Sequence, residues 1–152
     1  MAELSIIIPG RNEIYSAKTI QSILDASEAD IEIIMVLDGV WVDPPIPQHP
    51  RVNVIFVPES IGQRAATNLG VKLSKSKYIA KVDAHCSFDQ GFDRKMIEFM
   101  KEMGDDVTAV PVMKNLHAFD WTCNDCDWIR YQGPTPVKCE KCGGPNYYKK
   151  MI

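Results

Sequence analysis

Short, continuous apolar runs alternate with helically periodic stretches through the first two thirds of the chain. The runs are rich in β-branched residues, which is typical of strands buried on both faces. This pattern predicts strands over residues 4–8, 31–37, 52–57, 78–82 and 107–112. Apolar residues at helical spacing predict helices over residues 14–24, 61–73 and 92–103. The small residues of the second helix, from Gly62 to Gly70, indicate close packing on a sheet.

Strands that alternate with helices pair in parallel through crossovers, so we expect an α/β fold with an open, mostly parallel sheet. Residues 43–50 include four prolines and cannot join the sheet, because proline lacks the N–H donor and has a fixed φ. In open sheets of this class, ligands bind at the carboxyl ends of the strands. Asp38 ends one predicted strand and Asp83 follows another, which predicts a site at that edge.

The composition changes near residue 116, which divides the chain into a domain over 1–115 and a small module over 116–152. Two C-x-x-C pairs in the module predict a structural zinc site, because four thiolates close a tetrahedral shell and leave no open position. Disulfides or free thiols are the alternative reading. The pairs are Cys123 with Cys126 and Cys139 with Cys142. The fifth cysteine, Cys86, is expected to be a small buried residue.

The triplet Asp83-Ala84-His85 is the most suggestive candidate for catalytic chemistry. A carboxylate and an imidazole suit Mn²⁺ or Mg²⁺, with the remaining positions left to phosphate oxygens and water. Alternatively, an aspartate at a strand end is a turn former.

Other polar residues at the predicted edge have the same two readings. Asp38 either caps the turn before Gly39 or accepts hydrogen bonds from a base or ribose. Arg11 and Glu13 either cap the following helix or line a nucleotide pocket, and Arg64 either reaches a phosphate or is solvated. Asp89 and Asp93 are read as turn and cap residues.

Charge and composition narrow the classes of function. The net charge of -3 argues against a general electrostatic grip on nucleic acid or anionic membrane, although a local basic patch is not excluded. No apolar run approaches the roughly 20 residues that span a bilayer. The N-terminal residues do not have the pattern of a secretory signal, so we expect a cytoplasmic protein in which zinc is favoured over disulfides.

Four segments in this order and spacing resemble the GT-A glycosyltransferases, in particular family 2. They are Ser5-Ile6-Ile7-Ile8-Pro9-Gly10-Arg11-Asn12-Glu13, Glu32-Ile33-Ile34-Met35-Val36-Leu37-Asp38-Gly39, the helix start from Gly62 to Gly70, and Ile79-Ala80-Lys81-Val82-Asp83-Ala84-His85. The Asp-x-His form is also similar to that of polypeptide N-acetylgalactosaminyltransferases.

The resemblance implies a nucleotide-sugar donor, with a UDP-sugar favoured, and an unknown acceptor. It implies the following places for the residues: Pro9, Arg11 and Glu13 around the nucleotide, Asp38 near the base or ribose, and Asp83 with His85 on a divalent metal that bridges the diphosphate. An acceptor hydroxyl would attack the anomeric carbon, and a carboxylate base would take its proton in an inverting enzyme.

The family's catalytic base lies well downstream of the metal motif, and only 67 residues follow His85 in this chain. Asp120 is the candidate base and His117 the candidate third metal ligand. A partner chain or second copy could complete the acceptor site. The alternative function is a catalytically incomplete nucleotide-binding module whose zinc ribbon mediates protein or nucleic-acid contacts. Nucleotidyl transfer is a third option, since it also uses strand-end carboxylates on metals.

Overall fold

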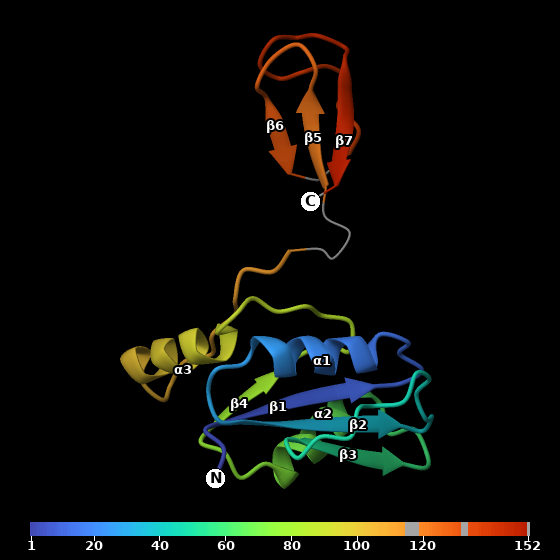
Figure 1. The fold of residues 1–152 in the computed structure, drawn as a ribbon, viewed down its shortest axis with the longest axis vertical. Helices are drawn as coiled ribbons and strands as arrows, with labels where there is room; N and C mark the ends of the chain where they lie inside the picture. Colours follow the sequence, from blue (N-terminus) through green and yellow to red (C-terminus); the bar gives the residue numbers. More distant parts are fainter. Residues whose placement is uncertain (115–118, 132–133, 152) are drawn as a thin grey trace. The chain divides into compact units, whose positions relative to one another are not determined.

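The computed structural model describes residues 1–114, 119–131 and 134–151. The chain divides into two compact units, Met1–Ala109 and Val110–Ile152. Along the first unit the order is β1 (Leu4–Gly10), α1 (Ser16–Ala26), β2 (Ile31–Asp38), β3 (Val52–Val57), α2 (Gln63–Leu73), β4 (Tyr78–Lys81) and α3 (Phe92–Met103). Its four strands form one parallel sheet in the order β3-β2-β1-β4 (Figure 1). The expected α/β fold is confirmed.

Helices cover both faces of this sheet, which explains why the strands are continuously apolar. Side chains alternate between the faces along β1. Ile6 packs in a cluster with Ile20 of α1 and Ile97 of α3, whereas Ile7 packs with Ala66 of α2 on the other face. Figure 1 shows α1 and α3 on one side of the sheet. Each fully buried isoleucine stabilises the fold by roughly 1.5–3 kcal/mol.

Close packing of α2 on the sheet depends on a glycine. A Cβ added to Gly70 would lie 2.5 Å from Cγ2 of Ile7, which is itself fully buried. The expectation from the small residues of this helix is therefore confirmed. The helix begins at Gln63, two residues later than predicted, because the N–H groups of Ile61 and Gly62 donate to the Asp38 carboxylate.

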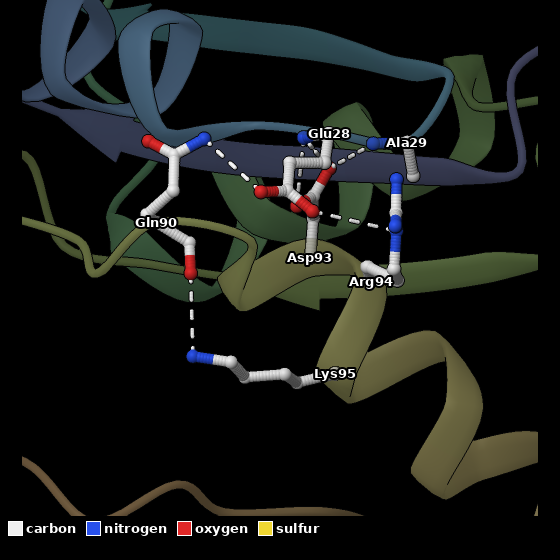
Figure 2. Close-up of polar contacts among 6 residues, drawn as sticks. All are labelled: Glu28, Ala29, Gln90, Asp93, Arg94 and Lys95. Atoms are coloured by element: carbon white, nitrogen blue, oxygen red, sulfur yellow. Dashed lines mark hydrogen bonds and ion pairs between the residues drawn. The ribbon is translucent and has the colours of Figure 1, made fainter.

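A fully buried aspartate fixes α3 to the turn that follows α1. Asp93 accepts hydrogen bonds from the backbone N–H of Glu28 at 3.0 Å and of Ala29 at 2.8 Å (Figure 2). Arg94 pairs with the Glu28 carboxylate at 3.5 Å on the exposed side of the same contact. Asp93 was expected to be a cap residue, but it caps neither end of α3: its carboxylate instead accepts from the backbone of the α1–β2 turn, and Gly91 is the N-cap of α3.

The strand predicted over residues 107–112 is absent, so this prediction was wrong. The segment has no regular structure, and Val110 and Val112 are 83% and 96% exposed. A β-branched run forms a strand only where a neighbour accepts its hydrogen bonds, and no described strand pairs with it. Pro111 also removes one backbone donor from the middle of the run.

The second unit is a small antiparallel sheet in the order β6-β5-β7. Its strands are β5 (Phe119–Cys123), β6 (Ile129–Tyr131) and β7 (Tyr147–Met151). Trp121 is 6% exposed and meets Phe119 and Tyr147 edge to face, each with ring centroids 5.6 Å apart. Three aromatic rings therefore make most of its small core. In the described parts of the chain, no helix has the length and apolarity that a membrane crossing needs.

Candidate functional site

The strand order of the first sheet reverses between β1 and β4. β2 follows β1 through α1 and pairs with one edge of β1. β4 follows β3 through α2 and pairs with the other edge of β1. In α/β proteins, ligands bind at the carboxyl ends of the strands next to such a reversal. Pro9 and Gly10 end β1 as buried residues, and Arg11 follows as an exposed one.

The Asp83-Ala84-His85 segment lies next to the end of β1. A Cβ on Gly10 would lie 3.6 Å from Cβ of Ala84 and 3.9 Å from Cγ of Glu13. Two segments more than 70 residues apart in the sequence thus meet at the reversal point. The structure brings the predicted residues of β1 and β4 together.

Asp38 ends β2 at the same edge and is only 4% exposed. Its carboxylate accepts hydrogen bonds from the Ser60 hydroxyl at 2.9 Å, the Ile61 N–H at 2.7 Å and the Gly62 N–H at 3.0 Å. Burial alone would raise its pKa, but these donors and the charge of Arg11 hold the pKa of Asp38 below its ordinary value. Asp38 therefore remains ionised and orders the loop before α2.

Ser60 links two of the predicted residues and was missed by the sequence reasoning. Its hydroxyl accepts a hydrogen bond from the Arg11 guanidinium at 3.2 Å and donates to Asp38. The available signal was position, because Ser60 comes three residues after the carboxyl end of β3, at the same edge of the sheet where Asp38 ends β2. Arg11, Ser60 and Asp38 form one polar chain along the edge of the sheet.

The predicted metal pair lies at the surface beside β4. Asp83 forms an ion pair with Lys81, and both side chains are about 40% exposed (39% for Lys81 and 40% for Asp83). Exposed pairs of this kind contribute at most about 1 kcal/mol, so a divalent cation can displace the lysine. His85 is exposed. The donor set of one carboxylate and one imidazole fits a divalent ion whose other ligands come from phosphate and water.

The other predicted residues lie as follows. Arg64 is exposed in the first turn of α2. Asp120 lies on β5 in the second unit, opposite Tyr131 and Lys150 in the strand register. His117 lies outside the described residues. Cys86 is half-buried, and burial raises the pKa of its thiol.

The four cysteines of the second unit converge on one point. Their sulfur atoms all lie within 4.8 Å of one another, with 3.7 Å between Cys123 and Cys142 and 3.6 Å between Cys126 and Cys139. A tetrahedral site with zinc–sulfur bonds of about 2.3 Å has sulfur–sulfur edges of about 3.8 Å. None of the four forms a disulfide. In the described parts of the chain, no other group of three or more such ligands comes together.

The pKa values of these thiols differ from one cysteine to another. Burial acts to raise the pKa of Cys139, but the N–H groups of Cys142 and Lys141 donate to its sulfur and bring the pKa to about 7. The pKa of Cys126 is raised to about 12: a hydrogen bond from the Trp128 backbone lowers it, but burial and the neighbouring sulfurs raise it by more. Thiolates bind zinc, so the lowered pKa of Cys139 favours metal binding at that ligand.

The sequence matches the family described as Glycosyl transferase family 2 over residues 5–122. An uncharacterized glycosyltransferase of Haemophilus influenzae is 31% identical over 107 residues, which cover 66% of this chain and 43% of that protein. The glycosyltransferase GlyG of Streptococcus pneumoniae is 30% identical over 128 residues, covering 79% of this chain and 41% of that protein. The chain spans less than half the length of these relatives.

Solved structures agree in fold. A crystal structure of S. aureus TarS superimposes with a TM-score of 0.53 at 16% identity, covering 72% of this chain and 23% of that one. The structure of S. aureus TarS 1-349 gives a TM-score of 0.54 at 15% identity, over 80% of this chain and 42% of that one.

Proposed function

The chain belongs to glycosyl transferase family 2, and from this premise we propose that its first unit binds a nucleotide-sugar donor, with a UDP-sugar favoured. The sugar would pass to a hydroxyl group of an acceptor. The observation that carries the proposal is the convergence of Arg11, Asp38 and the Asp83 segment at the carboxyl edge of one parallel sheet. A ligand with separate polar groups fits such a row of polar side chains.

Each residue at this edge has a distinct role in the proposal. Arg11 is exposed and brings a positive charge next to the reversal point, where a diphosphate would lie. Asp38 holds Ser60 and the start of α2 in place, and Arg64, exposed in the first turn of α2, would supply a second positive charge to the diphosphate. Pro9 and Glu13 shape the wall that follows β1. These groups bind and orient the donor.

Asp83 and His85 are the residues that would hold a divalent ion, Mn²⁺ or Mg²⁺. When bound, such an ion neutralises charge on the diphosphate that leaves as its bond to the sugar breaks. The acceptor oxygen forms the new bond to the anomeric carbon and gives its proton to a base. Asp120 is the candidate for that base, on β5 of the second unit.

Calorimetry of the full chain with UDP and Mn²⁺ tests this proposal. Asp83→Ala and His85→Ala are each expected to weaken Mn²⁺-dependent UDP binding by about tenfold or more, which is about 1.4 kcal/mol. Asp89→Ala is the matched control, because Asp89 is an exposed carboxylate on the same loop. Equal affinities for all four proteins would show that the metal site is assigned wrongly.

For the second unit we propose a structural zinc ion held by Cys123, Cys126, Cys139 and Cys142. Support comes from the sulfur distances and from the small core around Trp121, which is too little to stabilise the unit alone. The ion would contribute folding energy and would not take part in sugar transfer.

A second candidate function is a nucleotide-binding module without turnover, whose zinc ribbon contacts a partner. The position of Asp120 favours it, because this candidate base belongs to β5 of the second unit, whereas the other predicted donor-site residues belong to the first unit. UDP binding without release of sugar from a UDP-sugar in the presence of simple sugar acceptors would support the module. Under the first candidate, an added partner chain or second copy that completes the acceptor site would restore turnover.

A further inference from the structure

Trp41 is a large aromatic side chain left in solvent close to the proposed donor site. It is 65% exposed, whereas Trp121 is 6% exposed and Trp128 is half-buried. Trp41 comes three residues after Asp38, in the segment that leaves the carboxyl end of β2. Exposing an indole forgoes the stabilisation that its burial would give, and it leaves a flat aromatic surface available to a ligand.

The Phe56 ring fixes the orientation of this indole. Its ring stacks on Phe56 with centroids 4.6 Å apart and planes only 8° from parallel. Phe56 is a residue of β3 and pairs with Leu37, the residue before Asp38. One face of Trp41 is therefore held against Phe56 near the carboxyl end of β3, and the other face is left as a flat, solvent-facing platform.

Asp38 cannot supply all the contacts of a nucleobase. A carboxylate has about four acceptor positions, and three of them already serve Ser60, Ile61 and Gly62. A base also has two flat faces, which hydrogen bonds at its edge leave uncovered. The outer face of Trp41 offers the planar surface that stacking requires.

The spacing along the sheet agrees with an extended nucleotide. Strands lie about 4.8 Å apart, so β3 is about 10 Å from β1. A diphosphate near Arg11 and the reversal point would leave its base over the β2 and β3 ends, where Trp41 lies. Resting on the proposed donor binding, we propose that Trp41 stacks on the nucleobase of the donor and that Phe56 keeps the indole in the stacking orientation.

Titrations of the full chain with a panel of UDP, dTDP, GDP, ADP and CDP, and with inorganic pyrophosphate, test the inference. The variants are Trp41→Ala, Trp41→Phe and the control Trp128→Phe in the second unit. For the tightest nucleotide, Trp41→Ala is expected to weaken binding about tenfold, Trp41→Phe by less, and pyrophosphate affinity is expected to stay unchanged. Stacking also quenches indole emission, so the nucleotide should quench wild type and Trp128→Phe but not Trp41→Phe. Thermal midpoints check that each variant is folded.

The outcomes separate the two proposals. Nucleotide binding that Trp41→Ala leaves unchanged, with the quench retained in Trp41→Phe, overturns the stacking role and leaves donor binding intact. Equal weakening of nucleotide and pyrophosphate shows that Trp41 only shields Phe56, which also overturns it. If no member of the panel binds wild type with Mn²⁺ present, the proposed function fails and the stacking role fails with it.

Discussion

Removing one cysteine of the second unit tests the zinc site most directly. Cys139 is 1% exposed, and its sulfur lies 3.6 Å from that of Cys126. The sulfur–sulfur edge of a tetrahedral zinc site is about 3.8 Å, so the sulfur atoms have the spacing that a zinc ion requires. Cys139→Ser leaves three thiolates and a hydroxyl, which is a poor zinc ligand at neutral pH.

The expected magnitude is large because the unit has little else to hold it. Apparent binding free energies for structural zinc in small peptides are about 10–16 kcal/mol, more than the total stability of most small domains. The apolar core of the described ribbon strands centres on Trp121 and its two edge-to-face neighbours. Loss of the ion should therefore unfold the ribbon and leave the first unit, with its own core, folded.

The assay is zinc content by mass spectrometry together with tryptophan emission. Wild type is expected to contain about one zinc ion per chain, and Cys139→Ser close to none. Emission should shift to longer wavelength as Trp121 meets water, while the helical circular dichroism of the first unit is retained. Cys86→Ser is the matched control, because Cys86 belongs to the first unit and should keep the full zinc content. Wild type without zinc, or equal zinc in both variants, would refute the assignment.

Three further substitutions test the first unit. Asp38→Asn replaces an acceptor by a donor facing the Ser60–Gly62 loop, and should lower the free energy of unfolding by about 1–3 kcal/mol at pH 7. Because the folded pKa of Asp38 is below the ordinary value, its contribution is present above about pH 4 and is lost as the pH falls through the folded pKa. Urea titrations should show the stabilities of the two proteins converging as the pH falls below the ordinary pKa of an aspartate, and a constant difference would contradict this linkage. Asp93→Ala should lower the free energy of unfolding by about 3 kcal/mol in the same assay, because two backbone donors lose their acceptor. The control Asp89→Ala, at an exposed position, should lower it by less than about 0.5 kcal/mol. Gly70→Ala should lower the melting temperature, since overpacking against a buried isoleucine costs about 1–3 kcal/mol and the gain in helix propensity is about 1 kcal/mol; an unchanged or higher melting temperature would show that the sheet can move away.

The regular elements of the first unit could be predicted from the sequence because their cause is local and repeated. A strand with a continuous apolar run such as Ile6-Ile7-Ile8 is stable only where both faces of its sheet are covered. Apolar residues at helical spacing between residues 92 and 103 are compatible only with an amphipathic helix. The segment over residues 107–112 shows the limit of this reasoning. Its valines favour a strand, but pairing depends on a neighbouring strand that no local pattern reveals.

For the candidate sites as well, the residue types could be predicted from the sequence, but their contacts could not. The sequence determined which residue types could act: two C-x-x-C pairs for zinc, and Asp38, Asp83 and His85 at strand ends. Only the tertiary structure brought Ser60 between Arg11 and Asp38, since these contacts join residues 22 and 49 positions apart. Likewise, only the stacking on Phe56 fixed the orientation of Trp41. Residue type is local information, whereas the partners of a side chain are chosen by how the strands pair.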